Sequence, residues 1–268
     1  MGIFVHILSS GDDIMIYVTG DTHGEFKRFK NRLFGANEHD IVIICGDFGG
    51  IWDNSSTEKY WLKWLCDKPY RILFCDGNHE NYDMINSYPV ETLFGGKVHK
   101  ITDNIYHLIR GEMFEIDGKK IFVMGGARSH DISDGILDPS DEDFKMKEKA
   151  LIRRKKEYYR VKGVSWWEEE MPSDEEFSHA LETFRKNNYS CDYIITHDCP
   201  SSVQKILIDN YIEEKKKAQY SCDRLNEFLQ GISEKCEFKK WYFGHYHLDA
   251  DISEKYRLLS EDIFEIGD

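Results

Sequence analysis

The strongest constraint on the fold of this chain is a repeated pattern of a short apolar run followed at once by a polar cluster. The runs occupy residues 15–19, 41–45, 71–75, 192–195 and 240–243. Short, continuous runs rich in β-branched residues and bounded by glycine are typical of strands buried on both faces. Helical segments at about 25–33 and 57–66 separate the first three runs. This strand–loop–helix repetition predicts an α/β protein with largely parallel strands.

Further apolar segments predict additional strands around this core. Residues 105–109, 113–116 and 120–124 alternate or run apolar, and Asp117-Gly118 is a tight hairpin signal. We expect an antiparallel addition here, packed as a second sheet on the first. Short strands near 257–259 and 263–266 complete the predicted core.

A charged stretch from about 130 to 190 has helical propensity and interrupts the pattern. Within it, residues 145–162 hold nine Lys/Arg against two Glu, a local charge of +7. Trp166-Trp167 follow, and Pro172-Ser173-Asp174 marks a helix start. We interpret the stretch as an insertion over one domain spanning 1–268. The basic run and the tryptophan pair either line an access channel for an anionic substrate or form an ordinary solvated and packed surface.

Composition excludes several classes of protein. A 41% hydrophobic content rules out a wholly disordered chain, and no segment approaches the ~18 apolar residues of a membrane helix. The first residues lack the charged region of a signal peptide, so we expect a cytoplasmic protein with reduced cysteines. Whether residues 1–14 belong to the native start stays open. A net charge of −14 argues against broad binding to nucleic acid.

The polar clusters contain the donor atoms of a mixed nitrogen and oxygen metal site. Their chemistry-bearing residues are Asp21, His23, Asp47, Asn78, His79, His197, His245 and His247. Carboxylate, amide and imidazole groups of this kind bind divalent metals. Such a set exceeds the needs of one tetrahedral ion and suits two ions that share a carboxylate. Two such ions can act on the entering and leaving oxygens of a displacement at phosphorus.

Each cluster has an ordinary structural explanation when it is taken alone. Gly46-Asp47 is a common turn pair, and a lone His197 is more often a buried or capping histidine. His245 and His247 are a stronger signal, because alternate residues of a strand share one face. Five clusters that all follow apolar runs at the same relative place make chance assembly a poor explanation.

The ordered clusters resemble the calcineurin-like metallophosphoesterase superfamily over residues 15–247. The matching blocks are Gly20-Asp21-Thr22-His23-Gly24, Gly46-Asp47, Gly77-Asn78-His79-Glu80, Thr196-His197 and Gly244-His245-Tyr246-His247. The resemblance implies an α/β fold, a four-layer αββα sandwich of two mixed β-sheets flanked by helices. It is specific for fold and metal chemistry and weakly specific for substrate.

The resemblance also implies a role for each matching residue. One metal would bind Asp21, His23, Asp47 and His247, and a second would bind Asp47, Asn78, His197 and His245. Asp47 is then the bridging ligand. His79 matches a histidine that stabilises the transferring phosphoryl group or protonates the leaving oxygen. Asp76 and Asp198 are alternative partners that would orient His79, and each is also a plausible strand-end hydrogen-bonding residue.

Two departures bear on substrate class. The protein Ser/Thr phosphatase branch has Asp-Arg-Gly shortly after Gly-Asp, whereas Phe48-Gly49-Gly50 follow Asp47 here, which argues against that activity. Arg128 either replaces the missing arginine or is a surface residue. Ser129, His130 and Asp131, which follow it, are further candidate substrate contacts.

These observations predict a dinuclear metal-dependent phosphoesterase that hydrolyses P–O ester bonds by a metal-bridging hydroxide, with His79 assisting. We expect two divalent ions, with manganese active in vitro and iron, zinc or nickel as alternatives, since such ligands do not fix the metal. A phosphodiesterase or nuclease and a nucleotide pyrophosphohydrolase remain open on the same site. An inert binding module is a further alternative, although such modules usually lose ligands. The expected partner is a phosphate ester, with nucleotides and short oligonucleotides as candidates, and no membrane or obligate protein partner.

Overall fold

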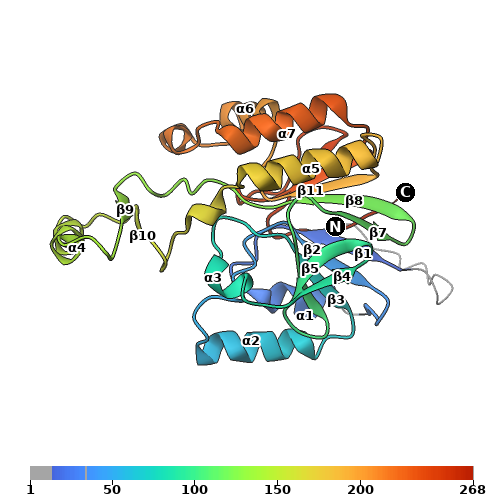
Figure 1. Ribbon diagram of the computed structural model, residues 1–268, viewed down its shortest axis with the longest axis horizontal. Coiled ribbons are helices and arrows are strands. Elements are labelled where there is room, and N and C mark those ends of the chain that lie inside the picture. Colours follow the sequence, from blue (N-terminus) through green and yellow to red (C-terminus); the bar gives the residue numbers. More distant parts are fainter. Residues whose placement is uncertain (1–13, 34, 268) are drawn as a thin grey trace.

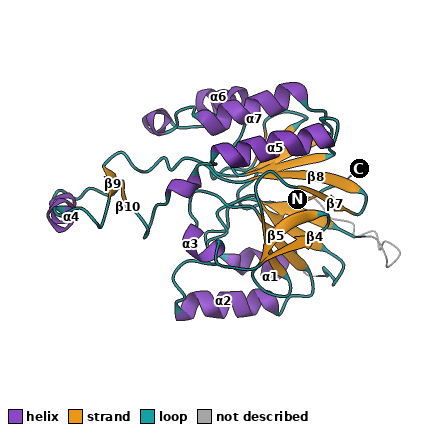
Figure 2. Ribbon diagram, viewed as in Figure 1, coloured by secondary structure: helices purple, strands orange, loops and turns teal. Residues whose placement is uncertain are grey.

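Two β-sheets packed face to face form the body of the molecule, and helices cover the outer face of each sheet (Figures 1 and 2). The computed structural model describes residues 14–33 and 35–267. The predicted α/β sandwich with helix, sheet, sheet and helix layers is confirmed. Residues 1–13, most of the segment whose role the sequence leaves open, lie outside the described residues.

The first sheet has seven strands, and its centre is parallel. Strands β1, β2, β3 and β6 run parallel, while β15, β5 and β4 pair antiparallel at the two sides. Across the sheet the order is β15 (Ile263–Glu265), β1 (Ile16–Thr19), β2 (Ile41–Ile44), β3 (Arg71–Phe74), β6 (Ile105–Leu108), β5 (Gly96–Lys100) and β4 (Val90–Leu93).

The second sheet has six strands with the same design. Strands β14, β12, β11 and β8 are parallel, and β13 and β7 flank them in antiparallel pairs. Its order is β13 (Ala250–Asp251), β14 (Tyr256–Leu258), β12 (Lys240–Phe243), β11 (Tyr193–Thr196), β8 (Lys119–Met124) and β7 (Met113–Ile116).

The helices divide between the two outer faces (Figure 2). The first sheet is covered by η1 (Phe26–Arg28), α1 (Phe29–Arg32), α2 (Ser56–Cys66) and α3 (Tyr82–Ile85), and the second by α5 (Asp174–Lys186), α6 (Ser201–Asn210) and α7 (Arg224–Lys235). A further 3₁₀ helix, η3, spans Glu214–Gln219. Side-chain caps begin four of these helices: Ser55 before α2, Asn81 before α3, Ser173 before α5 and Asp223 before α7. The helix start predicted near Ser173 is therefore confirmed.

The apolar runs fill both faces of each sheet, as the sequence predicts. In β2, Ile41 and Ile43 enter the core between the sheets, while Val42 and Ile44 face the core under the helices. In β8, Val123 points between the sheets and Phe122 toward α5. The alternation follows from the two-residue period of a strand, and it explains why β2 contains no polar residue.

The antiparallel addition predicted for 105–124 is correct for β7 and β8 but wrong for β6. β6 pairs parallel with β3 and completes the first sheet, because the intervening β4–β5 hairpin lets the chain return in the same direction. That hairpin was missed in the sequence, as were α6 and α7. Three residues of β4 are exposed, so the strand carries no apolar alternation to recognise.

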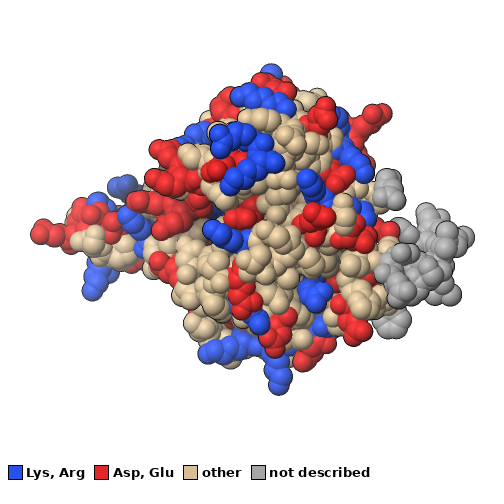
Figure 3. Space-filling model, turned by 45° about the vertical axis from the view of Figure 1, so that its right-hand side comes forward, with Lys and Arg blue, Asp and Glu red and all other residues tan. Residues whose placement is uncertain are grey.

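The charged stretch forms a projecting arm, which we define as residues 130–167 (Figure 1). It contains β9 (Gly135–Leu137), α4 (Phe144–Arg153) and β10 (Tyr159–Val161), and β9 and β10 pair in parallel. η2 (Glu168–Glu170) follows and leads to α5, which packs on the second sheet. Acidic and basic residues lie together on the arm (Figure 3).

Two expectations from composition concern membrane-spanning helices and the state of the cysteines. Between residues 14 and 267, apart from residue 34, no helix combines the length and apolarity needed to cross a lipid bilayer. All seven cysteines are free thiols, and Cys45 and Cys75 are buried directly after β2 and β3.

Candidate metal centre

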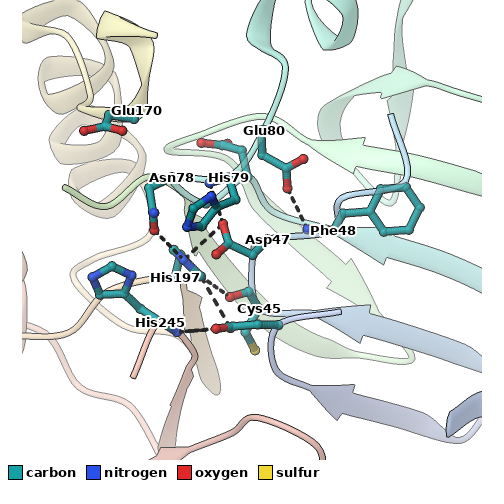
Figure 4. Close-up of polar contacts among 12 residues, drawn as sticks. Cys45, Asp47, Phe48, Asn78, His79, Glu80, Glu170, His197 and His245 are labelled. Atoms are coloured by element: carbon teal, nitrogen blue, oxygen red, sulfur yellow. Dashed lines mark hydrogen bonds and ion pairs between the residues drawn. The ribbon is translucent and has the colours of Figure 1, made fainter. Parts of the chain in front are cut away.

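The polar clusters meet at one rim of the sandwich, where both sheets end their parallel strands (Figure 4). The loops after β1, β2 and β3 of the first sheet bring Asp21, Asp47 and Asn78 to this rim. The loops after β11 and β12 of the second sheet bring His197, His245 and His247. The site therefore lies between the two sheets, and each sheet supplies about half of its donors.

Glycines in the motifs leave room for the donor groups. A Cβ on Gly77 would lie 2.1 Å from Asp47 Oδ1, and one on Gly244 would lie 2.2 Å from Asp21 Oδ1. A Cβ on Gly46 would lie 2.2 Å from His197 Nδ1. Each of these distances is far inside van der Waals contact. The Gly-Asp, Gly-Asn and Gly-His pairs in the sequence thus have a steric cause.

Four donor residues have backbone angles that L-residues rarely adopt. The φ values are 45° for His23, 47° for Asp47, 73° for His245 and 52° for His247. Left-handed conformations cost energy for residues with a Cβ and tend to occur at functional sites. The fold accepts this cost at four places around one small volume, where these side chains approach one another.

Four side chains form a compact cluster of possible metal ligands. One donor atom from each of Asp21, His23, Asp47 and His247 lies within 4.8 Å of the others. His23 Nε2 is 3.2 Å from His247 Nε2, and His247 Nε2 is 3.3 Å from Asp21 Oδ2. His23 Nε2 is 3.7 Å from Asp47 Oδ2.

A second group of donors adjoins the first through Asp47. His197 Nε2 lies 3.2 Å from Asn78 Oδ1 and 3.4 Å from Asp47 Oδ1. The His245 ring centre is 5.1 Å from that of His197, and the His245 backbone N–H donates to Asp21 Oδ1 at 3.0 Å. Asp47 thus presents one oxygen to each group.

The buried donors suit a cation. Asp47 Oδ2 and Asn78 Nδ2 have no hydrogen-bond partner among the described residues, although both residues are buried. An unpartnered carboxylate oxygen in such a place is costly unless a cation or ordered water satisfies it. Burial lowers the pKa of His23 to about 4 and that of His245 well below its usual value, so both imidazoles are neutral near pH 7, as a ligand must be.

His197 differs from the other imidazoles. Burial lowers its pKa, but the Asp47 and Asp21 carboxylates outweigh burial and raise the pKa to about 10. His197 Nδ1 is also 2.7 Å from the carbonyl oxygen of Cys45. In the protein without metal, His197 therefore carries the charge that compensates these buried carboxylates, and a bound cation would take over that role.

His79 lies beside both donor groups. Its backbone N–H donates to Asp47 Oδ1 at 2.8 Å, and its ring centre is 5.3 Å from that of His23. Burial lowers the pKa of His79. Neither Asp76 nor Asp198 is hydrogen-bonded to it: Asp76 pairs with Arg110 and His107, and Asp198 accepts from the Tyr246 hydroxyl at 2.7 Å.

Glu80 has a positioning role that sequence reasoning missed. Its Oε1 accepts a hydrogen bond from the Phe48 backbone N–H at 2.7 Å, which ties the loop after β3 to the loop after β2 (Figure 4). Burial raises the pKa of this carboxyl well above its usual range. Its place in the Gly-Asn-His-Glu block was the available signal.

The candidate substrate contacts from the sequence lie in different environments in the structure. Arg128 is exposed and donates to Ser221 Oγ at 3.0 Å. The His130 ring stacks on Tyr220 at 4.8 Å and meets the His245 ring edge-on at 5.3 Å. Ser129 is buried against Glu170, and Asp131 pairs with Arg160.

A pocket beside the donors is lined by residues that include Arg128, His130, Asp198, Tyr220 and His245. Neither Tyr220 nor Arg160 was singled out in the sequence.

The chain matches a family model and is similar to solved structures. A family model described as calcineurin-like phosphoesterase matches residues 14–249. No curated protein sequence matches the chain. Among solved structures, the chain is similar to that of a phosphopantetheinyl hydrolase from Mycobacterium tuberculosis, with 12% sequence identity and a TM-score of 0.43. That match covers 94% of this chain and 89% of the other.

Proposed function

Because the chain belongs to the calcineurin-like phosphoesterase family and is therefore a metal-dependent phosphoesterase-type hydrolase, we propose that it cleaves P–O ester bonds at a dinuclear metal centre on this rim. One ion would be held by Asp21, His23, Asp47 and His247, and the other by Asp47, Asn78, His197 and His245. The observation that carries the proposal is the buried Asp47 carboxylate, which lies between both donor groups and has an oxygen without a hydrogen-bond partner in the described part of the chain.

When bound, a pair of divalent ions lowers the pKa of water and neutralises charge on phosphoryl oxygens. Manganese is the ion that we expect to support turnover in vitro. The chain itself contributes rigidity: Asp47 is fixed by the His79 backbone N–H, and Glu80 fixes the loop that carries Asp47. The donors are therefore positioned before any substrate arrives, which is the main requirement of phosphoryl transfer.

His79 is the residue that we assign to the phosphoryl group or the leaving oxygen. Its lowered pKa makes it largely neutral at pH 7 in the protein without metal. A neutral imidazole still donates one ring N–H, so hydrogen bonding to a phosphoryl oxygen fits this environment. Approach of a doubly charged phosphate would raise the pKa again and favour proton donation.

The test compares p-nitrophenyl phosphate with its bis-ester in manganese-loaded protein. We expect turnover of at least one ester, and Asp47→Asn should reduce it by at least about 100-fold, because both ions lose a shared ligand. Bound manganese, measured by mass spectrometry, should fall in the same variant. The preferred ester then distinguishes monoesterase from diesterase activity.

Asp103→Asn is the matched control, since Asp103 is exposed and pairs with Lys100 far from the rim. It should retain full turnover and metal content. Full turnover in Asp47→Asn, or a wild-type protein that binds no divalent metal, would refute the dinuclear proposal and favour a binding module.

A further inference from the structure

We propose that Arg160, which the projecting arm brings to the candidate metal centre, binds the non-esterified oxygens of the substrate's phosphoryl group. The inference rests on the proposed phosphoesterase function and adds a residue that no motif contains. It makes the arm a part of the substrate site.

The base of the arm is fixed to the body of the molecule. Glu170, just after the arm, accepts hydrogen bonds from Ser129 N at 3.0 Å and Ser129 Oγ at 2.7 Å, and its carbonyl oxygen accepts from Ala127 N. Trp167 Nε1 donates to Asp83 Oδ2 at 2.8 Å. The Trp167 ring also meets the Trp52 ring edge-on at 5.6 Å. Both ends of the arm are thus held beside the rim.

Pairing within the arm fixes the position of Arg160. Arg160 lies opposite Ile136 in the β9–β10 pair. Backbone hydrogen bonds continue on both sides, from Asp134 N to Tyr158 O at 2.7 Å and from Lys162 N to Leu137 O at 2.9 Å. β10, which carries Arg160, is therefore held by backbone pairing to β9, the strand that follows the start of the arm.

The guanidinium of Arg160 is oriented by Asp131 along one edge. Arg160 Nε lies 3.2 Å from Asp131 Oδ1, and Nη2 contacts Asp131 Oδ2. Nη1 makes no hydrogen bond to any residue that the structure describes, which leaves the edge formed by Nη1 and Nη2 available. Guanidinium edges bind phosphate with two parallel hydrogen bonds, and an Asp on the adjacent edge holds the group still.

Through its partner Asp131, this guanidinium is tied to the chain segment that borders the centre. Asp131 follows His130, whose ring centre is 5.3 Å from that of His245 and 6.4 Å from that of His247. In this proposal, the arm therefore supplies a cation beside the phosphoryl group bound at the centre.

Other arginines near the rim are already committed. Arg28 donates to the carbonyl oxygens of Asp21 and Ser260, and Arg110 is buried on Asp76. Arg128, the candidate from the sequence, is exposed and bound to Ser221. Arg160 is therefore the better candidate for the clamp that the sequence lacks after Asp47.

The experiment measures binding of inorganic phosphate to manganese-loaded protein by calorimetry, together with turnover of both p-nitrophenyl esters. Arg160→Gln should weaken phosphate binding by about 10- to 100-fold, with manganese content unchanged. KM for the monoester should rise more than that for the diester, which has one fewer non-esterified oxygen. Arg160→Lys should recover part of the loss. Arg154→Gln, on the exposed end of α4, is the matched control and should behave as wild type.

The outcomes separate this inference from the function on which it rests. Unchanged phosphate affinity and KM in folded Arg160→Gln would overturn the role of Arg160 while wild-type turnover upholds the phosphoesterase. If Arg160→Gln destabilises the arm, Arg160→Met replaces it, because Met keeps the apolar part of the side chain. Its phosphate affinity and KM then test the role of Arg160 in the same way. Wild-type protein that binds manganese but neither binds phosphate nor cleaves either ester would overturn both proposals.

Discussion

At the scale of single residues, the candidate centre is defined as much by missing side chains as by those present. Gly77 has an ordinary negative φ, so its backbone does not require glycine. A Cβ there would meet Asp47 Oδ1 at 2.1 Å, Asp47 N at 2.6 Å and the His197 ring at 2.7 Å. Because two of these atoms belong to donor side chains and one to backbone, none can move away without displacing the site.

Gly77→Ala should therefore damage the site through sterics alone. We expect a loss of about 1–3 kcal/mol in the free energy of unfolding, as for other overpacked sites, and reduced manganese binding. Gly231→Ala is the matched control in α7, where a Cβ meets nothing within 4 Å. It should stabilise the protein by about 0.5–1 kcal/mol through helix propensity. Urea unfolding and metal content measure both effects, and equal behaviour of the two variants would contradict this explanation.

At the scale of elements, the sequence predicts the strands that are buried on both faces. It does not predict the bounds of strands and helices that are largely exposed. The runs that became β2 and β8 were recognisable because every second residue enters a different core. β4 is largely exposed and α4 buries no side chain, so neither had a hydrophobic pattern to reveal its bounds. In the same way, motifs predicted Asp47 and His245, whereas Arg160 reaches the rim only through the path of the arm. No local pattern encodes that path.

Glu170 links the arm, through η2, to the loop after β8, and its environment predicts a pH effect. Burial raises its pKa from 4.5 to about 7. Because the folded-state pKa is raised, the stabilisation is complete below the unfolded pKa and is lost as pH rises through about 7. The loss corresponds to about 3 kcal/mol by pH 8. Glu170→Gln, studied without metal, should therefore melt several degrees higher than wild type at pH 8 and at a similar temperature at pH 4.5. A less stable variant at pH 8 would show that the ionised carboxylate is needed.

At the scale of the whole molecule, the rim joins two sheets whose facing surfaces share an apolar core. The core between the sheets contains residues such as Ile43, Val123 and Tyr242. Across the rim, Asp47 from the first sheet faces His197 from the second at 3.4 Å. An ion bound by donors of both sheets would therefore act as a cross-link between the layers. It would also offset part of the net charge of −14.

Metal binding should accordingly stabilise the whole sandwich. At about 100 times its dissociation constant, each ion contributes about 2.7 kcal/mol, or a rise in Tm of about 5–10 °C for a chain of this size. Calorimetry with manganese and then with a chelator should show the rise and its reversal. Asp103→Asn should respond as wild type does, and Asp47→Asn should respond much less. An equal rise in Asp47→Asn would mean that the ions act by screening the acidic surface, because screening does not depend on a ligand buried between the two sheets.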